Sequence, residues 1–191
     1  MGAHSTRYST VAIFLHWLIA LIIIANIIGA FVSEPFFESS NPADKATGAL
    51  LMGLHKAAGI SVIFLTLVRI GWRLMHPPAA LPAHMARWEV ALSKATHGVF
   101  YFLMLAVPLA GWLMSSAHPG ASPISWFGFF EIPQLPIADN KATAHFWEEV
   151  HEISGYAMIG LIVLHVAAAL KHQFINRDDV LARMAPWLAR R

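Results

Sequence analysis

The sequence predicts an all-α integral membrane protein that folds as a four-helix bundle. Its 191 residues are 57% hydrophobic and only 13% charged, and their mean hydropathy is +0.57. A water-soluble domain of this size needs more charge to cover its surface, so the composition indicates the membrane class. The whole chain, residues 1–191, is expected to form one transmembrane domain. Four apolar segments are long enough for membrane helices, at about 11–32, 48–72, 97–114 and 149–171.

The first apolar segment has no Asp, Glu, Lys or Arg between Tyr8 and Ser33. This run can cross a hydrocarbon layer of about 30 Å, and it exceeds the apolar core of a cleaved signal peptide. We therefore interpret it as a retained first span. We expect Glu34 and Pro35 to end its helix and a polar connection to continue to about Ala46.

The second segment carries His55 and Lys56 near its start and Arg69 near its end, and a proline-containing connection is expected from Arg73 to Lys94. A long connection also follows the third segment. Its SWFGFF stretch, residues 125–130, is apolar and aromatic. We expect this stretch to lie in the membrane interface and not to cross the bilayer.

The distribution of Lys and Arg predicts the orientation. If both termini and the second connection share one side, that side holds ten of the thirteen Lys and Arg residues, and the other side holds eight of the eleven acidic residues. Loops rich in Lys and Arg stay in the cytoplasm, so both termini are expected to be cytoplasmic. The ten are Arg7, Arg69, Arg73, Arg87, Lys94, Lys171, Arg177, Arg183, Arg190 and Arg191.

Two histidines of the fourth segment, His151 and His165, are fourteen residues apart. Fourteen residues make nearly four helical turns, so both rings leave one face of the helix, about 21 Å apart along it. The predicted topology puts His16 at the depth of His165, near the cytoplasmic face. It puts His55 at the depth of His151, near the outer face.

A small residue follows each of these four histidines at position i+4, on the same helix face. Such a residue leaves a flat recess where a porphyrin can lie against the backbone. Small residues also occur at membrane helix interfaces without a cofactor, and a single membrane histidine is often only a hydrogen-bonding group. The small residues are Ala20, Gly59, Gly155 and Ala169.

Paired neutral imidazoles from different helices, with no carboxylate at their depth, fit the axial positions of haem better than a tetrahedral zinc site. The chain has no cysteine, which excludes thiolate ligands and covalent attachment of haem through a Cys-x-x-Cys-His motif. The histidine pairs therefore predict two b-type haems whose iron carries electrons. A metal transporter that uses the histidines directly is an alternative, and the absence of acidic residues within the spans speaks against it.

Four segments of the chain resemble the bacterial cytochrome b561 family, whose members are membrane dihaem proteins related to the cytochrome b subunits of nickel–iron hydrogenases. These segments are FLHW, LHKAAG, WEEVHEISGY and GLIVLH. The resemblance covers nearly the whole chain. It implies that His16, His55, His151 and His165 are haem ligands, and that superoxide is oxidised on the periplasmic side with ubiquinone as electron acceptor.

Further residues are candidates for contacts with the cofactor and the quinone. Arg69 and Arg73 at the inner end and Lys56 at the outer end are placed to bind haem propionates, although the arginines also suit positive-inside anchoring. His97 and His172 lie toward the inner face and match quinone-contacting histidines of the family. A histidine suits such a site because its charge changes near neutral pH.

The sequence thus predicts an oxidoreductase that transfers electrons between a small periplasmic donor, superoxide, and the ubiquinone pool. No catalytic residue is assigned. The alternative function is a membrane anchor that carries electrons for a separate dehydrogenase or hydrogenase, with SWFGFF as its docking surface. Membrane lipid is an expected partner and nucleic acid is not.

Overall fold

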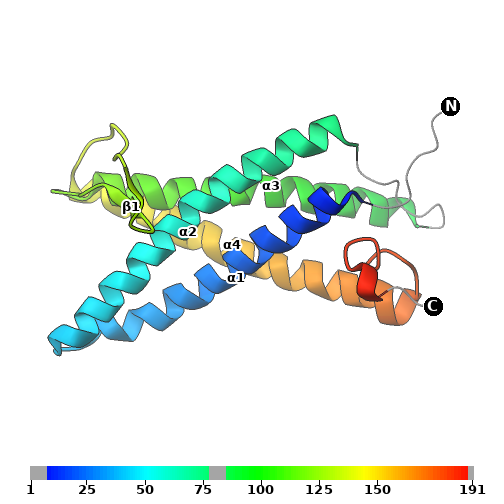
Figure 1. The fold of residues 1–191 in the computed structure, drawn as a ribbon, viewed down its shortest axis with the longest axis horizontal. Helices are drawn as coiled ribbons and strands as arrows, with labels where there is room; N and C mark the ends of the chain where they lie inside the picture. The colour runs from blue at the N-terminus through cyan, green and yellow to red at the C-terminus, as the bar shows by residue number, and fades with distance from the viewer. Residues whose placement is uncertain (1–7, 78–84, 189–191) are drawn as a thin grey trace.

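The computed structural model describes residues 8–77 and 85–188. Arg7, Arg190 and Arg191, which contributed to the predicted orientation, lie outside the described residues. The described part contains four long helices, a two-stranded hairpin and two short helical turns (Figure 1). The elements are α1 (Thr10–Glu38), α2 (Pro42–Met75), α3 (Arg87–Ala117), β1 (Ile124–Trp126), β2 (Phe130–Ile132), α4 (Lys141–Lys171), the π-helical turn η1 (His172–Asn176) and the 3-10 turn η2 (Pro186–Leu188).

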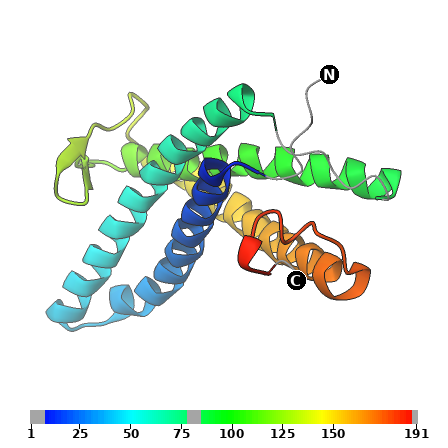
Figure 2. The same cartoon turned by 45° about the vertical axis from the view of Figure 1, so that its right-hand side comes forward.

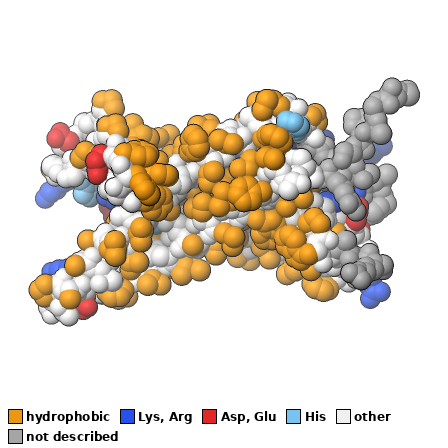
Figure 3. All heavy atoms as spheres, in the orientation of Figure 1, with side chains coloured by type: hydrophobic (Ala, Val, Ile, Leu, Met, Phe, Trp, Pro, Cys, Tyr) orange, Lys and Arg blue, Asp and Glu red, His pale blue; other side chains and the backbone are white. Residues whose placement is uncertain are grey.

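All four long helices are long and apolar enough to cross a membrane. Their outer surface is mostly hydrophobic along the middle of the molecule, whereas the charged side chains visible in Figure 3 gather toward its two ends. Large apolar side chains such as Phe64 and Phe102 are exposed on the helices, which suits a lipid environment and not water. The predicted all-α membrane bundle is confirmed.

The predicted end of the first helix is wrong. Helix α1 continues through Pro35 to Glu38, and only residues 39–41 separate it from α2. The extension packs tightly against the next helix, because a Cβ added to Gly48 would lie 3.1 Å from the Cβ of Phe36. Asn41 caps α2 by accepting a hydrogen bond from the backbone N–H of Ala43 at 3.0 Å, and Pro42 occupies the first helical turn.

The third and fourth helices also begin earlier than predicted, at Arg87 and Lys141. Hydropathy marks only the part of a helix that lies in lipid, whereas polar capping groups set where the helix starts. Asn140 accepts a hydrogen bond from the backbone N–H of Thr143 at 2.9 Å. At the start of α3 the backbone N–H of Ala86 donates to Glu89 Oε2 at 3.3 Å.

The helices pack in chain order, α1 against α2, α2 against α3, and α3 against α4. In the described part of the chain, no Cα of α4 comes within 8 Å of a Cα of α1 or α2. Figure 2 shows the α1–α2 pair crossing the α3–α4 pair at a steep angle. Helix α4 is therefore separated from α1 and α2 by a gap that side chains must fill.

The bundle has two distinct ends. At the terminal end, the start of α1 meets the end of α2 and the C-terminal segment: Trp72 Nε1 donates to Ser9 Oγ at 3.0 Å, and Trp17 Nε1 donates to the carbonyl of Met184 at 2.8 Å. At the hairpin end lie the α1–α2 turn and the β1–β2 hairpin (Figure 1). The distribution of Lys and Arg predicts that the terminal end faces the cytoplasm.

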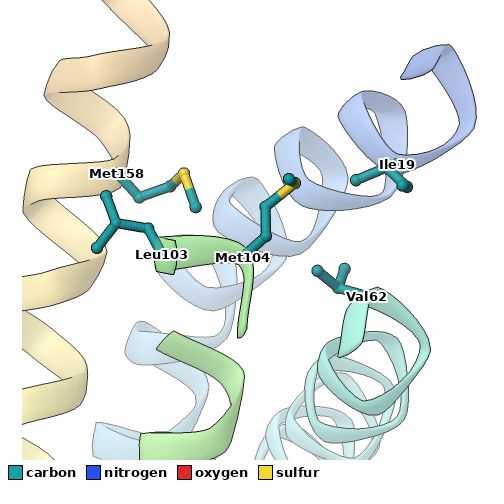
Figure 4. Close-up of a cluster of buried hydrophobic side chains, with 5 residues drawn as sticks. All are labelled: Ile19, Val62, Leu103, Met104 and Met158. Carbon is teal, nitrogen blue, oxygen red and sulfur yellow. The ribbon is translucent and has the colours of Figure 1, made fainter. Parts of the chain in front are cut away.

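A cluster of buried side chains closes the middle of the bundle and draws on all four helices (Figure 4). Met158 of this cluster is seven residues from both His151 and His165, so it lies halfway between them along α4. The cluster therefore separates the two ends of the molecule. Its members are Ile19, Val62, Leu103, Met104 and Met158.

Candidate cofactor site

Two predicted ligand residues, His55 of α2 and His151 of α4, meet near the hairpin end. Their ring centres are 6.0 Å apart and the ring planes are inclined by 84°. His151 Nδ1 lies 2.8 Å from the carbonyl of Val107, and His55 Nδ1 lies 3.3 Å from the carbonyl of Asn26. A carbonyl only accepts hydrogen bonds, so both Nδ1 atoms donate and both Nε2 atoms keep a free lone pair.

The His55–His151 pair lies in a cavity of about 330 Å³. Gly59 and Gly155, two of the small residues that follow predicted ligands, line this cavity, and a Cβ added at Gly155 would meet no atom within 4 Å. The recess predicted from the i+4 pattern is therefore present at this end. Glu152 also lines the cavity, so the expectation that no carboxylate shares this depth is wrong.

Gly111 of α3 was not predicted to belong to the site. A Cβ added there would lie 2.9 Å from Cε1 and 3.0 Å from Nδ1 of His151. Any larger residue would displace the imidazole, so this glycine sets how closely α3 can approach the ring. The only sequence signal was a glycine in an apolar span, which is compatible with many other roles.

Lys56, a predicted propionate contact, lines the same cavity. Its Nζ donates to Ser115 Oγ at 3.0 Å, across from α2 to α3. Of the cavity-lining residues that the structure describes, Lys56 is the one with a cationic side chain. It can therefore attract an anion toward the His55–His151 pair.

The second predicted pair, His16 of α1 and His165 of α4, meets toward the terminal end with ring centres 6.3 Å apart. Arg69 Nη1 lies 3.2 Å from His16 Nδ1, and Arg69 Nε donates to the hydroxyl of Tyr101 at 3.2 Å. A guanidinium only donates, so His16 Nδ1 accepts here. Arg69 was predicted as a propionate contact, whereas its contact with His16 was not.

His97 of α3 is also close to this pair, with its ring centre 5.8 Å from that of His165. Its Nδ1 donates to the carbonyl of Ser93 at 2.6 Å. Helix α3 packs directly on α4, whereas α1 stays apart from α4. His16 therefore reaches His165 across a wider separation between helices than His97 does.

Thr66 marks a polar position inside the bundle. Its side chain is fully buried, with 0% exposed, and Oγ1 has no hydrogen-bond partner among the described residues. On α2 it lies between Val62 of the central cluster and Arg69, which contacts His16. An unsatisfied buried hydroxyl is rare and costly in folded proteins, and this one suits a polar atom of a bound group.

The remaining predicted contacts, Arg73 and His172, are also at the terminal end. The guanidinium carbons of Arg73 and Arg69 lie 5.7 and 5.9 Å from the ring centre of Tyr101. His172 lies in η1, where Nδ1 donates to Asp178 Oδ2 at 2.6 Å. His172 therefore ties the C-terminal segment to the end of α4.

The two histidine pairs fit haem iron with two protein ligands. Metal–imidazole bonds are about 2 Å long, and each ring centre lies about 1 Å behind the bonding nitrogen, so the centres of two axial rings are about 6 Å apart. Both observed separations, 6.0 and 6.3 Å, match this value. Both pairs also join α4 to a helix whose Cα atoms all lie more than 8 Å from those of α4, and the His55–His151 pair lies in a cavity.

The chain is similar to known membrane cytochromes over nearly its whole length. A family model described as prokaryotic cytochrome b561 matches residues 7–187. The chain is 33% identical to Cytochrome b561 homolog 2 of Escherichia coli, over 93% of this chain and 90% of that protein. It is 31% identical to Cytochrome b561 homolog 1 of the same organism, over 94% and 97%.

A more distant relative, of Yersinia pestis, is named Probable superoxide oxidase CybB. It is 26% identical, over 94% of this chain and 96% of that protein. Cytochromes of this kind bind b-type haem and transfer electrons in the prokaryotic inner membrane, which they cross several times. The family match extends over nearly all of the chain, and the chain belongs to the prokaryotic cytochrome b561 family.

Proposed function

We propose that the protein is a single transmembrane domain with two haem b groups, one held by His16 and His165 and the other by His55 and His151. The observation that carries this proposal is that each pair brings a histidine of α4 together with one from a helix that does not pack directly on α4, with ring centres 6.3 and 6.0 Å apart. This separation is what two imidazoles on one metal ion would have. Haem held by these histidines would supply a one-electron carrier.

The chain's own residues orient the ligands and balance the charge of the cofactor. The carbonyls of Val107 and Asn26 hold the two hairpin-end rings with Nε2 directed away from them. We assign Arg69 and Arg73 to haem propionates at the terminal end and Lys56 to a propionate at the hairpin end, because cationic donors bind carboxylates strongly.

The proposed electron donor is superoxide, which would react at the hairpin end on the periplasmic side. Two superoxide anions would each lose one electron and become dioxygen. The two electrons, together with two protons, would reduce one ubiquinone to ubiquinol at the terminal end, so the reaction balances. Lys56 supports an anionic donor, and the relative named as a probable superoxide oxidase supports the same chemistry.

For ubiquinone we propose His97 and His172 as groups that exchange hydrogen bonds or protons with the quinone. His97 is the better placed of the two, with its ring 5.8 Å from that of His165. His172 is bonded to Asp178 and would act through a rearrangement of the C-terminal segment. The terminal end would face the cytoplasm, as the distribution of Lys and Arg indicates.

The proposed activity is tested with the purified protein in liposomes that contain ubiquinone. A superoxide-generating system should produce ubiquinol at a rate that depends on the protein and disappears when superoxide dismutase is added. His151→Ala, which removes a proposed ligand of the hairpin-end haem, should lower this rate by at least about tenfold. Ubiquinol formation equal to that of protein-free liposomes would contradict the superoxide assignment, whereas the haem content tests the ligands separately.

A further inference from the structure

The β1–β2 hairpin, residues 124–132, is a ribbon with two chemically different faces; we call it the aromatic hairpin. Its register pairs Trp126 with Phe130, and Ser125 with Glu131. Neighbouring residues of a strand point to opposite faces. The aromatic pair therefore occupies one face, with ring centres 4.9 Å apart, and the polar pair occupies the other.

The aromatic face lies against a membrane-spanning helix. Trp126 Nε1 donates to Ser61 Oγ of α2 at 3.0 Å. Ile124, on the same face of the ribbon as Trp126, is buried and lines the His55–His151 cavity. The aromatic hairpin is thus fixed to α2, and it forms part of the wall of the cavity.

The contact with α2 is at the depth of lipid. Ser61 is five residues beyond Lys56, inside the uncharged stretch 57–68, which places it about 8 Å further along the helix axis. Phe64 follows three residues later on the same side of α2, and 66% of its surface is exposed. The aromatic hairpin therefore continues a surface that faces lipid.

The turn of the hairpin directs further aromatic side chains outward. Phe127 and Gly128 both have positive φ, 51° and 81°, and the N–H of Phe129 donates to the carbonyl of Trp126 at 3.0 Å. Glycine adopts such a left-handed conformation readily, whereas the side chain of Phe127 disfavours it. Phe129 at the tip is 79% exposed.

We propose that the aromatic hairpin is embedded in the interface of the lipid leaflet at the hairpin end, with Phe129 among the lipids and Glu131 facing water. A bare two-stranded ribbon has unpaired backbone groups on its outer edges, which the hydrocarbon core cannot satisfy but the hydrated interface can. Aromatic side chains favour this zone. The surface of the aromatic hairpin is continuous with Phe64 of α2. Lipid therefore covers this surface, and a soluble dehydrogenase does not dock on it.

The absence of cysteine from the chain gives a direct test. Phe129→Cys and Glu131→Cys place single thiols two residues apart, on opposite sides of the proposed water boundary. The haem-loaded variants are reconstituted in phosphatidylethanolamine–phosphatidylglycerol liposomes and labelled with a charged, membrane-impermeant maleimide. We expect Phe129→Cys to react at least about tenfold more slowly than Glu131→Cys in liposomes, and at a similar rate once detergent dissolves the bilayer.

A second measurement identifies what covers the thiol. An environment-sensitive fluorophore on Phe129→Cys should be quenched by lipids that carry a nitroxide near the headgroup, and much less by lipids labelled at the end of the acyl chain. Equal labelling of the two thiols in liposomes would overturn the proposal. Slow labelling without lipid quenching would overturn it as well, because a second copy or another protein would then cover the hairpin. Neither readout depends on electron transfer, so the proposed function is tested independently.

Discussion

The two histidine pairs have similar ring separations but are held in different ways. At the hairpin end, main-chain carbonyls hold both rings through Nδ1. At the terminal end, the guanidinium of Arg69 contacts His16 Nδ1, and His165 packs against the rings of His97 and Phe100, at 5.8 and 5.2 Å.

This difference affects how each pair can bind a metal. A carbonyl keeps a hydrogen on Nδ1 and leaves Nε2 as the ligand atom, which is the usual arrangement of a metal-bound histidine. A guanidinium cannot accept that hydrogen. If His16 binds haem through Nε2 as we propose, its Nδ1 would carry the hydrogen, and Arg69 would be free to bind an acceptor such as a propionate. Main-chain carbonyls therefore hold both rings at the hairpin end, whereas a cationic side chain holds His16 at the terminal end.

The largest effect is expected from removal of a ligand at either end. His151→Ala and His165→Ala should each lower the haem content from two to about one per chain, because an axial position is lost. A pyridine haemochrome assay measures the stoichiometry, and a redox titration assigns the remaining haem to one end. His145→Ala, an exposed histidine of the same helix, should keep both haems. Two haems per chain in either variant would show that the substituted histidine is not needed to hold a haem.

Gly111→Ala should weaken the hairpin-end site alone. The added Cβ would lie 2.9 Å from His151 Cε1, so the ring must move. Loss of the groups that orient a metal ligand typically lowers the affinity for the bound group 10–100-fold, and we expect a loss of about tenfold in haem affinity here. Haem titration of the purified variant measures this loss. Gly98→Ala is the control on the same helix, because its Cβ meets no atom within 4 Å. An unchanged affinity in Gly111→Ala would show that the ring is not confined.

A smaller effect is expected when the cationic side chain beside one histidine pair is replaced, because only the haem at that end should change its midpoint potential. Arg69→Gln should lower the midpoint potential of the terminal-end haem by about 30–60 mV, because a positive charge beside the ligand favours the reduced iron, and 59 mV corresponds to a tenfold change for one electron. Lys56→Gln should lower the potential of the hairpin-end haem instead. Each variant serves as the control for the other in a spectroscopic redox titration. A shift of both potentials in both variants would show that the two ends are not independent.

The smallest effect concerns the C-terminal segment that covers the terminal end. Asp178→Asn should lower the free energy of unfolding by about 1–3 kcal/mol, because a buried hydrogen bond between His172 and a carboxylate is weakened. Asp179→Asn alters the pair between an exposed carboxylate and Arg183, and it should change stability by less than about 1 kcal/mol. Thermal unfolding in detergent compares the two. Equal losses would mean that the His172–Asp178 contact stabilises the segment no more than a surface pair does.

The sequence predicted which histidines lie close together, because their placement depends on local regularities, and their role as haem ligands stays a prediction. His151 and His165 share a helix face through the helical repeat alone, and their partners followed from hydropathy and charge. The helix starts were predicted poorly, since Asn41 and Asn140 act as caps outside the apolar segments. Gly111 was not recognised as part of the site, because its contact with His151 spans forty residues and depends on how α3 packs on α4.

The sequence by itself determined that the chain crosses a membrane four times and that four histidines lie at two depths, because burial in lipid and helical periodicity are properties of each segment alone. Only the tertiary structure decided that α4 stands apart from α1 and α2, and that Val107 and Arg69 hold histidines in opposite hydrogen-bonding roles. Those features depend on contacts between residues 44 and 53 positions apart, which form only when the helices pack against one another.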